Sequence, residues 1–287
     1  MASIAHVTDL HLVEESYRGR GVLERMRLCW LNAGRSIDPA RRREHALAAL
    51  RSARHSDHLL ITGDLTEDGV PAQFELLAEV LSEAGLEPER VTLVAGNHDL
   101  YVDPLAFTRA LEGPLRRYAR SSRPGQLLDI GSAFILPIDT AVKKPLTRSS
   151  GVFRPEQARQ IAHCAADTSL RGRPLVVAQH HPPLGYRNCV WNFIDGLDNV
   201  AAFSTLLHAH PRLHVVHGHT HHHGSRALTA ERREQIHSSA AIIDDARHVR
   251  FYHVGDDELR ALDAEPQQPW LASRAARPLA APVSQGA

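Results

Sequence analysis

The 287-residue sequence is poor in cysteine, lacks long apolar runs and has no excess of either charge. Its three cysteines lie far apart and form no Cys-x-x-Cys pair, which favours a reduced, cytoplasmic compartment over a disulfide-rich one. The 33 basic and 33 acidic residues cancel, so no specific nucleic-acid binding is expected. No run approaches the ~18 apolar residues that a membrane span requires, and we therefore expect a soluble protein.

Short apolar runs alternate with helical patterns along most of the chain. The strand-like runs cover residues 3–7, 58–62, 91–95, 133–138, 175–178 and 213–216. Helices are predicted between them, and four of these start at a proline: Pro39, Pro71, Pro104 and Pro155. Alternation of this kind predicts α/β layers with much parallel strand pairing.

The last third of the chain has a different pattern. Residues 224–228, 235–243 and 249–254 are expected to form consecutive antiparallel strands, so we predict two sheets, one mixed and one more antiparallel. Residues beyond about 262 are rich in Ala, Pro, Ser and Gln and lack a core of their own. We therefore predict one folded domain over residues 1–262 and a flexible tail over residues 263–287.

Five polar clusters stand at the ends of the strand-like runs. They supply Asp, Asn and His side chains, the ligand types that divalent metals bind, and the carboxyl ends of strands are where α/β proteins place their sites. In chain order they are Asp9-Leu10-His11, Gly63-Asp64, Gly96-Asn97-His98-Asp99, His180-His181-Pro182-Pro183 and His217-Gly218-His219. Each cluster alone can be a turn or a helix cap, but five in succession predict one composite metal site.

The number of candidate ligands points to two ions. Seven side chains exceed what one ion with open positions can use, whereas a carboxylate such as Asp64 can bridge two cations roughly 3.5–4 Å apart. Such a pair activates a bridging water for attack on a phosphoester. Mn, Fe and Zn are all compatible with this ligand set.

The motifs Asp-x-His, Gly-Asp, Gly-Asn-His-Asp, His-Pro and Gly-His-x-His appear in the order typical of calcineurin-like metallophosphoesterases, and the chain resembles that superfamily from Asp9 to His219. The resemblance implies a four-layer α-β-β-α sandwich of two mixed sheets. It implies a first metal held by Asp9, His11, Asp64 and His219, and a second held by Asp64, Asn97, His180 and His217. His98 resembles the catalytic histidine of the family, and Asp99 would orient it.

The resemblance also narrows the reaction. It implies hydrolysis of a small phosphodiester or phosphomonoester by a metal-bridging hydroxide, and the His180–Pro183 run is similar to bacterial cyclic-nucleotide and glycerophosphodiester phosphodiesterases. Two alternatives remain open. One is hydrolysis of a lipid-linked phosphoanhydride such as UDP-diacylglucosamine, and the other is a non-catalytic metal-binding scaffold.

A segment over residues 13–38 interrupts the pattern directly after the first cluster and is expected near the mouth of the site. Within it, Leu23, Met26 and Trp30 share one helical face. This helix can pack on the core, act as a lid, or contact lipid peripherally through residues 20–31. Trp191 and Phe193 can line the same mouth or belong to a buried cluster.

The remaining histidines near the clusters have simpler interpretations. We expect His181 to support a neighbouring ligand or to form a pocket wall. We expect His221, His222 and His223 to be solvated loop residues or the edge of the pocket.

Overall fold

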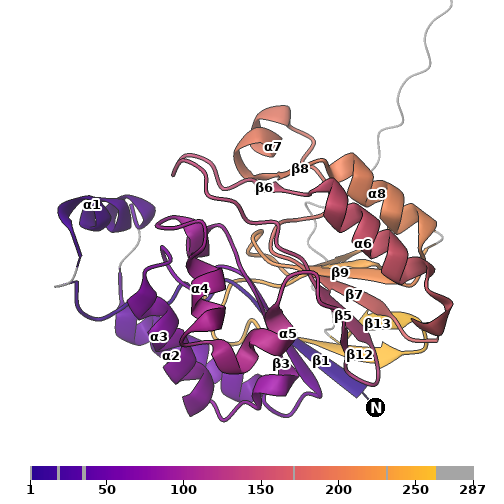
Figure 1. Ribbon diagram of the computed structural model, residues 1–287, viewed down its shortest axis with the longest axis horizontal. Coiled ribbons are helices and arrows are strands. Elements are labelled where there is room, and N and C mark those ends of the chain that lie inside the picture. Colours follow the sequence, from indigo (N-terminus) through magenta and orange to yellow (C-terminus); the bar gives the residue numbers. More distant parts are fainter. Residues whose placement is uncertain (1, 18–19, 34–36, 171, 231, 263–287) are drawn as a thin grey trace, which may run out of the picture.

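Two mixed β-sheets pack face to face, and helices cover their outer faces (Figure 1). The computed structural model describes residues 2–17, 20–33, 37–170, 172–230 and 232–262. The predicted tail over 263–287 lies outside the described residues, as do positions 18–19 and 34–36 of the segment over 13–38.

The first sheet contains the amino-terminal strands. Its order is β13-β12-β1-β2-β3, in which β1, β2 and β3 are parallel while β12 is antiparallel to both β1 and β13. The strand bounds, in that order, are Glu258–Ala261, Arg250–Gly255, Ala2–Val7, His58–Thr62 and Val91–Val94.

The second sheet has the order β10-β11-β9-β7-β5-β4, with a parallel centre and an antiparallel strand at each edge. Its bounds, in that order, are Gly224–Arg226, Ile236–Ser238, Leu213–His217, Leu175–Ala178, Phe134–Pro137 and Leu128–Asp129. A small parallel pair, β6 (Gly151–Val152) and β8 (Leu197–Asp198), lies beyond this sheet.

The helices begin largely where the sequence predicts. Asp38 accepts a hydrogen bond from the backbone N–H of Arg41 and caps α2, whose first residue is Pro39. The bounds are α1 Val22–Leu31, α2 Pro39–Ala53, α3 Pro71–Glu83, α4 Ala106–Glu112, α5 Ala119–Ser122, α6 Pro155–Ala166, α7 Cys189–Asp195 and α8 Val200–Ala209. None of the helices in the described ranges combines the length and apolar character that crossing a bilayer needs.

Three separate apolar layers follow from the alternation of side chains along the strands. Along β2, Leu59 and Ile61 face the layer under α2 and α3, whereas Leu60 faces the layer between the two sheets. Val177 on β7 packs in the third layer, beneath α6 and α8. Two helix–sheet cores and one sheet–sheet core make the four-layer α-β-β-α sandwich that the resemblance implies.

The prediction for the last strands is correct in location and for the antiparallel pair of β10 and β11, but wrong for β12, which does not pair with β11. The strand β11 pairs in parallel with β9 and antiparallel with β10, and β12 crosses to the other sheet to pair with β1. The turns after residue 238 separate β11 from β12, so the two strands close different sheets. Local apolar patterning defines each strand but carries no information on which sheet it joins.

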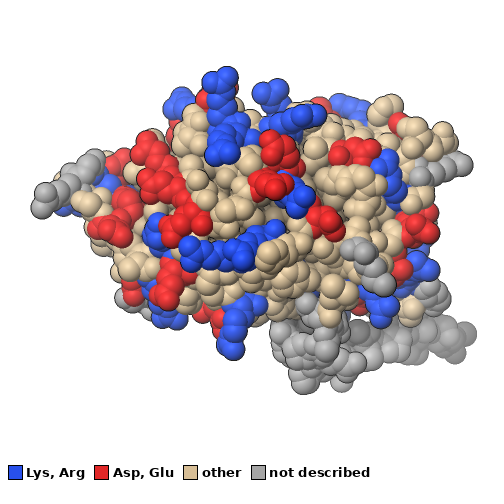
Figure 2. Space-filling view, turned by 90° about the horizontal axis from the view of Figure 1, so that it is seen from below, with Lys and Arg blue, Asp and Glu red and all other residues tan. Residues whose placement is uncertain are grey.

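Charged side chains of both signs are interspersed on the face that Figure 2 shows. This agrees with the zero net charge of the sequence. On that face, no single sign dominates in a way that would attract nucleic acid in general.

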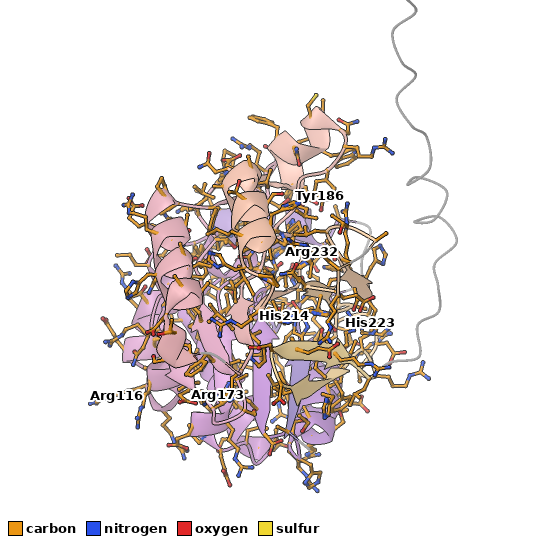
Figure 3. All side chains as sticks on the ribbon, turned by 90° about the vertical axis from the view of Figure 1, so that its right-hand side faces the viewer. Arg116, Arg173, Tyr186, His214, His223 and Arg232 are labelled. Atoms are coloured by element: carbon orange, nitrogen blue, oxygen red, sulfur yellow. The ribbon has the colours of Figure 1, made fainter. Side chains whose placement is uncertain are left out.

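Several histidines are buried between the two sheets. A ring nitrogen of His58 forms a hydrogen bond of 2.8 Å with the hydroxyl of Thr92, and a ring nitrogen of His6 lies 2.6 Å from the hydroxyl of Thr62. His214 lies near the centre of Figure 3 and stacks on His237 with ring centroids 5.8 Å apart. Burial lowers the pKa of His58 and of His214 to about 4, because a charged imidazole there would lose its hydration.

We predict that the folded state loses stability as the pH falls below ~6.5. In the unfolded chain these histidines bind protons at that pH, whereas in the folded protein they remain neutral. Each buried histidine therefore lowers the free energy of unfolding by about 1.4 kcal/mol per pH unit, until the pH reaches its folded pKa. Urea unfolding at pH ~7 and ~5 measures this. His58→Gln, which can still bond Thr92, should lose less stability over that interval than the wild type. The exposed His163→Gln is the control, and equal losses in both variants would contradict the prediction.

Candidate metal centre

The polar clusters predicted from the sequence meet at the carboxyl ends of the central strands, between the two sheets. Residues in the left-handed region of backbone conformation are concentrated there. Five of the seven described non-glycine residues with positive φ belong to this site, namely Asp9, His11, Asp64, His219 and His221. Such conformations cost about 1–3 kcal/mol each, and they persist where the surrounding structure holds functional side chains in place.

Four donor atoms converge on one side of Asp64. The Nε2 atom of His180 lies 3.2 Å from Oδ1 of Asn97, 3.4 Å from Oδ2 of Asp64 and 3.2 Å from Nδ1 of His219. The other ring nitrogen of His180 donates to the Thr62 carbonyl at 2.8 Å. That bond leaves a lone pair on Nε2, so these atoms form a cluster of electron donors that fits a cation.

The orientations of the other two ligands on this side are fixed by their outer contacts. The Nε2 atom of His219 lies 2.9 Å from Oδ1 of Asp195, which directs Nδ1 toward the cluster. The amide nitrogen of Asn97 donates to the hydroxyl of Tyr101 at 2.9 Å, which turns the amide oxygen toward His180. Each ligand is therefore held by a hydrogen bond on its far side, as in protein metal sites generally.

A second group lies on the other side of Asp64. Nε2 of His11 is 3.9 Å from Oδ1 of Asp9 and 3.8 Å from Oδ2 of Asp64, and Nε2 of His221 is 3.2 Å from the same Asp9 oxygen. Oδ1 of Asp9 and Nε2 of His11 are buried without a hydrogen-bond partner. Buried polar atoms are rarely left unpaired, so the lone pairs of these two atoms also fit a cation.

Asp64 belongs to both groups through one oxygen. Its Oδ1 accepts a hydrogen bond from the backbone N–H of His98 at 2.9 Å, which leaves Oδ2 as the atom that faces His11 and His180. Among the described residues, the acid–histidine sets able to hold a metal include Asp9 with His11 and His221, and Asp9 with Asp64 and His180. These two sets share Asp9, and Oδ2 of Asp64 lies between them, 3.8 Å from His11 and 3.4 Å from His180, so the bridging role of Asp64 stays a prediction that its position allows.

The histidine positions correct part of the expected ligand set. His217 is still paired within β9, and its Nδ1 lies 2.9 Å from the Gly218 carbonyl. It is in none of the potential metal-binding sets of the described residues, whereas His221 is. The chain leaves the strand only at Gly218, and the positive φ of His219 and His221 turns both side chains toward the site.

This arrangement shifts the histidine pair by two residues. The geometry places His219 in the group that was expected to contain His217, and His221 in the group expected to contain His219. His221 lines the cavity, in agreement with its expected place at the edge of the pocket, but the sequence analysis did not count it among the candidate ligands. The signal was available, because Gly218-His219-Thr220-His221 fits Gly-His-x-His literally.

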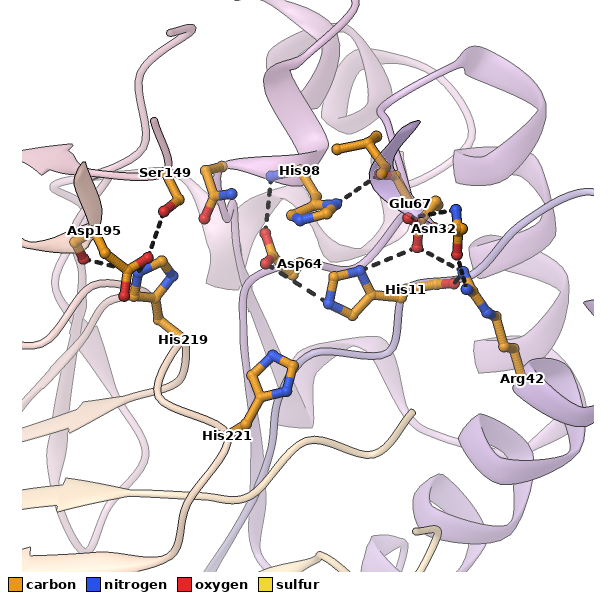
Figure 4. Close-up of a pocket in the computed structure, with 12 residues that line it drawn as sticks. His11, Asn32, Arg42, Asp64, Glu67, His98, Ser149, Asp195, His219 and His221 are labelled. Carbon is orange, nitrogen blue, oxygen red and sulfur yellow. Dashed lines mark hydrogen bonds and ion pairs between the residues drawn. The ribbon is translucent and has the colours of Figure 1, made fainter. Parts of the chain in front are cut away.

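His98 stands over the two groups in the 3₁₀ helix His98–Leu100 (Figure 4). Its Nδ1 donates to the Glu67 carbonyl at 2.7 Å, and its ring packs edge-on against that of His11 with centroids 4.4 Å apart. His98 lines the pocket beside Asp64 and Asn97. His98 therefore faces the pocket, and its catalytic role stays a prediction.

The hydrogen bonds that the structure describes for Asp99 are with the neighbouring loops and not with the ring of His98 that it was expected to orient. Its carboxylate accepts hydrogen bonds from the backbone N–H groups of Leu65, Thr66 and Gly96 at 2.8–3.2 Å and from the Thr66 hydroxyl at 2.7 Å. It therefore joins the loops that carry Asp64 and Asn97, while the Glu67 carbonyl orients His98. Burial, and then the nearby Asp64, raise the pKa of Asp99 to about 6.

Glu67 was not singled out in the sequence, yet it supports His11. Its Oε2 lies 3.2 Å from Nδ1 of His11 and accepts a hydrogen bond from Arg42, and its Oε1 accepts from Asn32 at 3.0 Å (Figure 4). Burial opposes ionisation of Glu67, but His11 holds its pKa down at about 2. A buried carboxylate thus fixes the ring so that Nε2 of His11 faces Asp9 and Asp64.

Two glycines are required by the close packing of this site. Gly63 has φ +94°, and a Cβ there would overlap the ring of His180. A Cβ at Gly218 would overlap the side chain of Thr8 beside Asp9. Any larger residue would force the ligand-bearing loops apart.

The protonation of the histidines reflects the charge of the carboxylates. Burial would lower the pKa of His180, but the nearby Asp64 raises it to about 9. Burial would likewise lower the pKa of His221, but Asp9 raises it to about 9. Without a metal, protons on these rings balance the buried carboxylates. Metal binding would replace these protons and is therefore favoured as the pH rises.

The site opens into a cavity of about 300 Å³. Its lining includes His11, His98, His219 and His221. Ser149, whose carbonyl contacts His181, also lines it. His181 itself is buried, with Nε2 2.7 Å from the Ser149 carbonyl and its ring 5.0 Å and 4.7 Å from those of His180 and His219, so its supporting role stays a prediction.

Comparison with known proteins places these features in a family. A protein from Rhodopseudomonas palustris named "Probable cyclic nucleotide phosphodiesterase" is 29% identical over 179 residues, which cover 62% of this chain and 56% of that protein. A Synechococcus protein with the same description is 28% identical over 184 residues, which cover 63% and 58%. The match thus spans less than two thirds of the length of either relative.

The likeness of the fold extends to a more distant protein. Purple acid phosphatase PPD1 from yellow lupin seeds superposes with a TM-score of 0.51 at 12% identity, covering 79% of this chain and 39% of that one. The family model for calcineurin-like phosphoesterases matches residues 2–223, which include every ligand candidate described above. The chain belongs to the calcineurin-like phosphoesterase family.

Proposed function

We propose that this protein is a dinuclear metal-dependent phosphoesterase that hydrolyses a small phosphodiester. The observation that carries the proposal is the single Asp64 oxygen shared by two groups of donors. One group comprises Asp9, His11 and His221, and the other comprises Asn97, His180 and His219. These revised sets are our proposed ligands for the two ions.

The donor types and their geometry fit two divalent ions of Mn, Fe or Zn. Such ions supply Lewis acidity that activates water and neutralises charge on a phosphoryl group. The chain's own contribution is to hold the ligands before binding, through the Thr62 carbonyl, Glu67 and Asp195. Loss of one such support misplaces a ligand without removing it.

His98 is the proposed acid. Its Nδ1–H is committed to the Glu67 carbonyl, so Nε2 is the ring atom available to the pocket. In the imidazolium form, Nε2–H donates to a phosphate oxygen or to the departing oxygen and completes the proton transfer. Asp99 contributes indirectly, because it fixes the loop that carries both Asn97 and His98.

A nucleotide-type diester is the first substrate class to test. Two relatives carry names that specify cyclic nucleotides, and the cavity of about 300 Å³ is at the lower end of the range for small-molecule sites. The polar lining, which includes Asn32 and Ser149, suits a hydrated, hydrogen-bonding ligand.

A lipid-linked phosphoanhydride is the second candidate. The observation that favours it is the exposure of apolar side chains on α1 and α7, because both helices end at the cavity. A substrate with an acyl tail could leave that tail against these helices while its phosphate enters the site.

We predict that the wild-type protein with added Mn²⁺ hydrolyses at least one phosphodiester in a panel of cyclic nucleotides, linear diesters, monoesters and nucleotide-sugar lipids. Asp64→Asn should reduce the rate by about 10³-fold or more, since both groups lose their shared anion. Metal content by elemental analysis and turnover of an aryl phosphodiester measure the effect. A metal-free wild type that is inactive on the whole panel, or full activity of Asp64→Asn, would refute the mechanism.

The histidine assignment has its own test. His221→Ala should lose bound metal and lower the rate by about 100-fold, because it removes a donor 3.2 Å from Asp9. His217→Gln should retain the metal and most of the activity, because His217 is outside the donor groups. Isothermal titration with Mn²⁺ and turnover on the same diester compare the two. The opposite result would restore the assignment expected from the sequence.

Glu67 should control metal affinity through His11. Glu67→Gln removes the negative charge opposite Nδ1 of His11 and should weaken binding of one metal ion by about 10–100-fold. Glu83→Gln, which breaks the surface pair with Arg43, is the control and should bind both ions as the wild type does. Thermal unfolding of the apo proteins separates misfolding from lost affinity. Unchanged affinity in a folded Glu67→Gln protein would contradict the supporting role.

A further inference from the structure

Exposed apolar side chains are concentrated on two helices. Of the nine large hydrophobic residues that are exposed in the described part of the chain, seven lie on α1 or α7. They are Val22, Leu23, Met26 and Trp30 on α1, and Val190, Trp191 and Phe193 on α7. Single exposed hydrophobics are common, but such a concentration marks an interaction surface.

The helix α1 is attached by its polar side. Arg27 bonds the carboxylate of Asp68 at 3.0 Å, and Arg20, just before the helix, bonds it at 2.7 Å. Asn32 at the other end donates to Glu67 at 3.0 Å. These contacts hold the helix against the loop that follows Asp64, so its apolar stripe faces outward.

This orientation is the reverse of that of an ordinary amphipathic helix. Leu23 is 79% exposed and Met26 62%, whereas Leu28 is the only residue between Val22 and Leu31 that is buried. Packing on the core, which was one of the sequence interpretations, is thus wrong for Leu23, Met26 and Trp30. The ion pairs of Arg20 and Arg27 keep the apolar side chains of α1 exposed to water. This exposure is unfavourable in free energy unless another apolar surface covers them.

The helix α7 is arranged similarly on the other side of the cavity. Asp195 at its end contacts His219 at 2.9 Å and accepts a hydrogen bond from Tyr186 at 3.1 Å. Trp191 and Phe193 are 57% and 58% exposed, and the guanidinium of Arg148 lies 3.8 Å from the centroid of the Phe193 ring. The same cavity is lined by Leu31 and Asn32 at the end of α1 and by Asp195 at the end of α7.

In Figure 1, α1 lies at the left end of the molecule, on the side of the first sheet, and α7 lies at its top, on the side of the second. The cavity with its donor groups lies between their inner ends. We call Val22, Leu23, Met26 and Trp30 together with Val190, Trp191 and Phe193 the rim residues.

We propose that the rim residues dock the protein on an anionic lipid surface, with the mouth of the metal site facing the lipid headgroups. The exposed charged residue within α1 is Arg25, and the exposed charged residue just before α7 is Arg187, so cations accompany both apolar patches. Tryptophan with nearby arginine is the composition of helices that lie in a membrane interface.

The shape of the surface favours lipid over a protein partner. The rim residues form two short patches on separate helices, with the polar cavity between the helix ends. A fluid lipid surface can receive two separated patches at once, whereas a peptide helix needs a continuous groove. The proposal concerns binding, so it does not require that the lipid be the substrate.

The chain offers internal probes for the test. Trp30 and Trp191 are the two described tryptophans, and both are rim residues, while Trp270 lies outside the described residues. In a full-length Trp270→Phe protein, emission should shift to shorter wavelength when vesicles of phosphatidylcholine and phosphatidylglycerol are added. The protein should also sediment with those vesicles, and less with phosphatidylcholine alone.

Variants locate the contact. Leu23→Ser with Met26→Ser, and Val190→Ser with Phe193→Ser, should each lower the vesicle partition coefficient by about 10-fold or more. Both pairs keep the tryptophan probes and should keep turnover of a soluble diester, because none of the four residues lines the cavity. Leu262→Ser is the matched control, since Leu262 is 58% exposed but lies on neither helix.

The outcomes are distinguishable from those for the proposed hydrolysis. A wild-type protein that hydrolyses the soluble diester but remains in the supernatant at every vesicle concentration would overturn the docking proposal alone. So would a wild-type dimer that the rim variants dissociate, because a second copy would then be the covering surface. Vesicle binding that falls in both rim variants and not in Leu262→Ser supports it, whether or not any phosphoester is cleaved.

Discussion

The structure around the site depends on the buried negative charge of Asp9 and Asp64. Both carboxylates are nearly inaccessible to water, and burial alone would raise the pKa of each, yet the nearby histidines hold both pKa values below the ordinary range. Buried anions require compensating cations. The Thr62 carbonyl and Glu67 position imidazole lone pairs toward the same space, so a divalent ion satisfies the carboxylates and the rings together. The left-handed backbone at Asp9, His11 and Asp64 is unfavourable by itself, and the surrounding packing holds it.

The four-layer fold explains how ligands from distant parts of the sequence meet. Parallel strands of both sheets end at the same edge, so loops after β1, β2, β3, β7 and β9 converge there. Asp99 strengthens the convergence, because its carboxylate binds the backbone on both sides of the gap between the Asp64 and Asn97 loops. The resemblance implies that Asp99 orients His98, but the carboxylate of Asp99 bonds these loops, and the Glu67 carbonyl accepts the hydrogen bond from His98.

Much of this arrangement could be predicted from the sequence, for identifiable physical reasons. Strand and helix locations follow from apolar periodicity and proline, and the ligand types follow from the polar residues at strand ends. Two features could not be predicted from the sequence. The pairing of β11 and β12 depends on long-range contacts that local patterning does not encode. The choice between His217 and His221 depends on where the strand ends, and residues inside a ladder cannot turn toward a site as residues after it can. Glu67 was missed because its effect on His11 exists only in three dimensions.

The orientation of α1 shows why amphipathic pattern alone does not determine which face a helix buries. The apolar stripe of Leu23, Met26 and Trp30 would suit a core, but Asp68 lies behind the helix and binds Arg20 and Arg27. Separating a buried carboxylate from its two guanidinium partners would leave an uncompensated charge, which costs more than exposing a few apolar side chains. The same attachment connects the helix, through Asn32 and Glu67, to the ring of His11. The outer surface and the candidate metal site are therefore joined by one polar network, so a displacement of α1 would reach the candidate ligand His11 through Asn32 and Glu67.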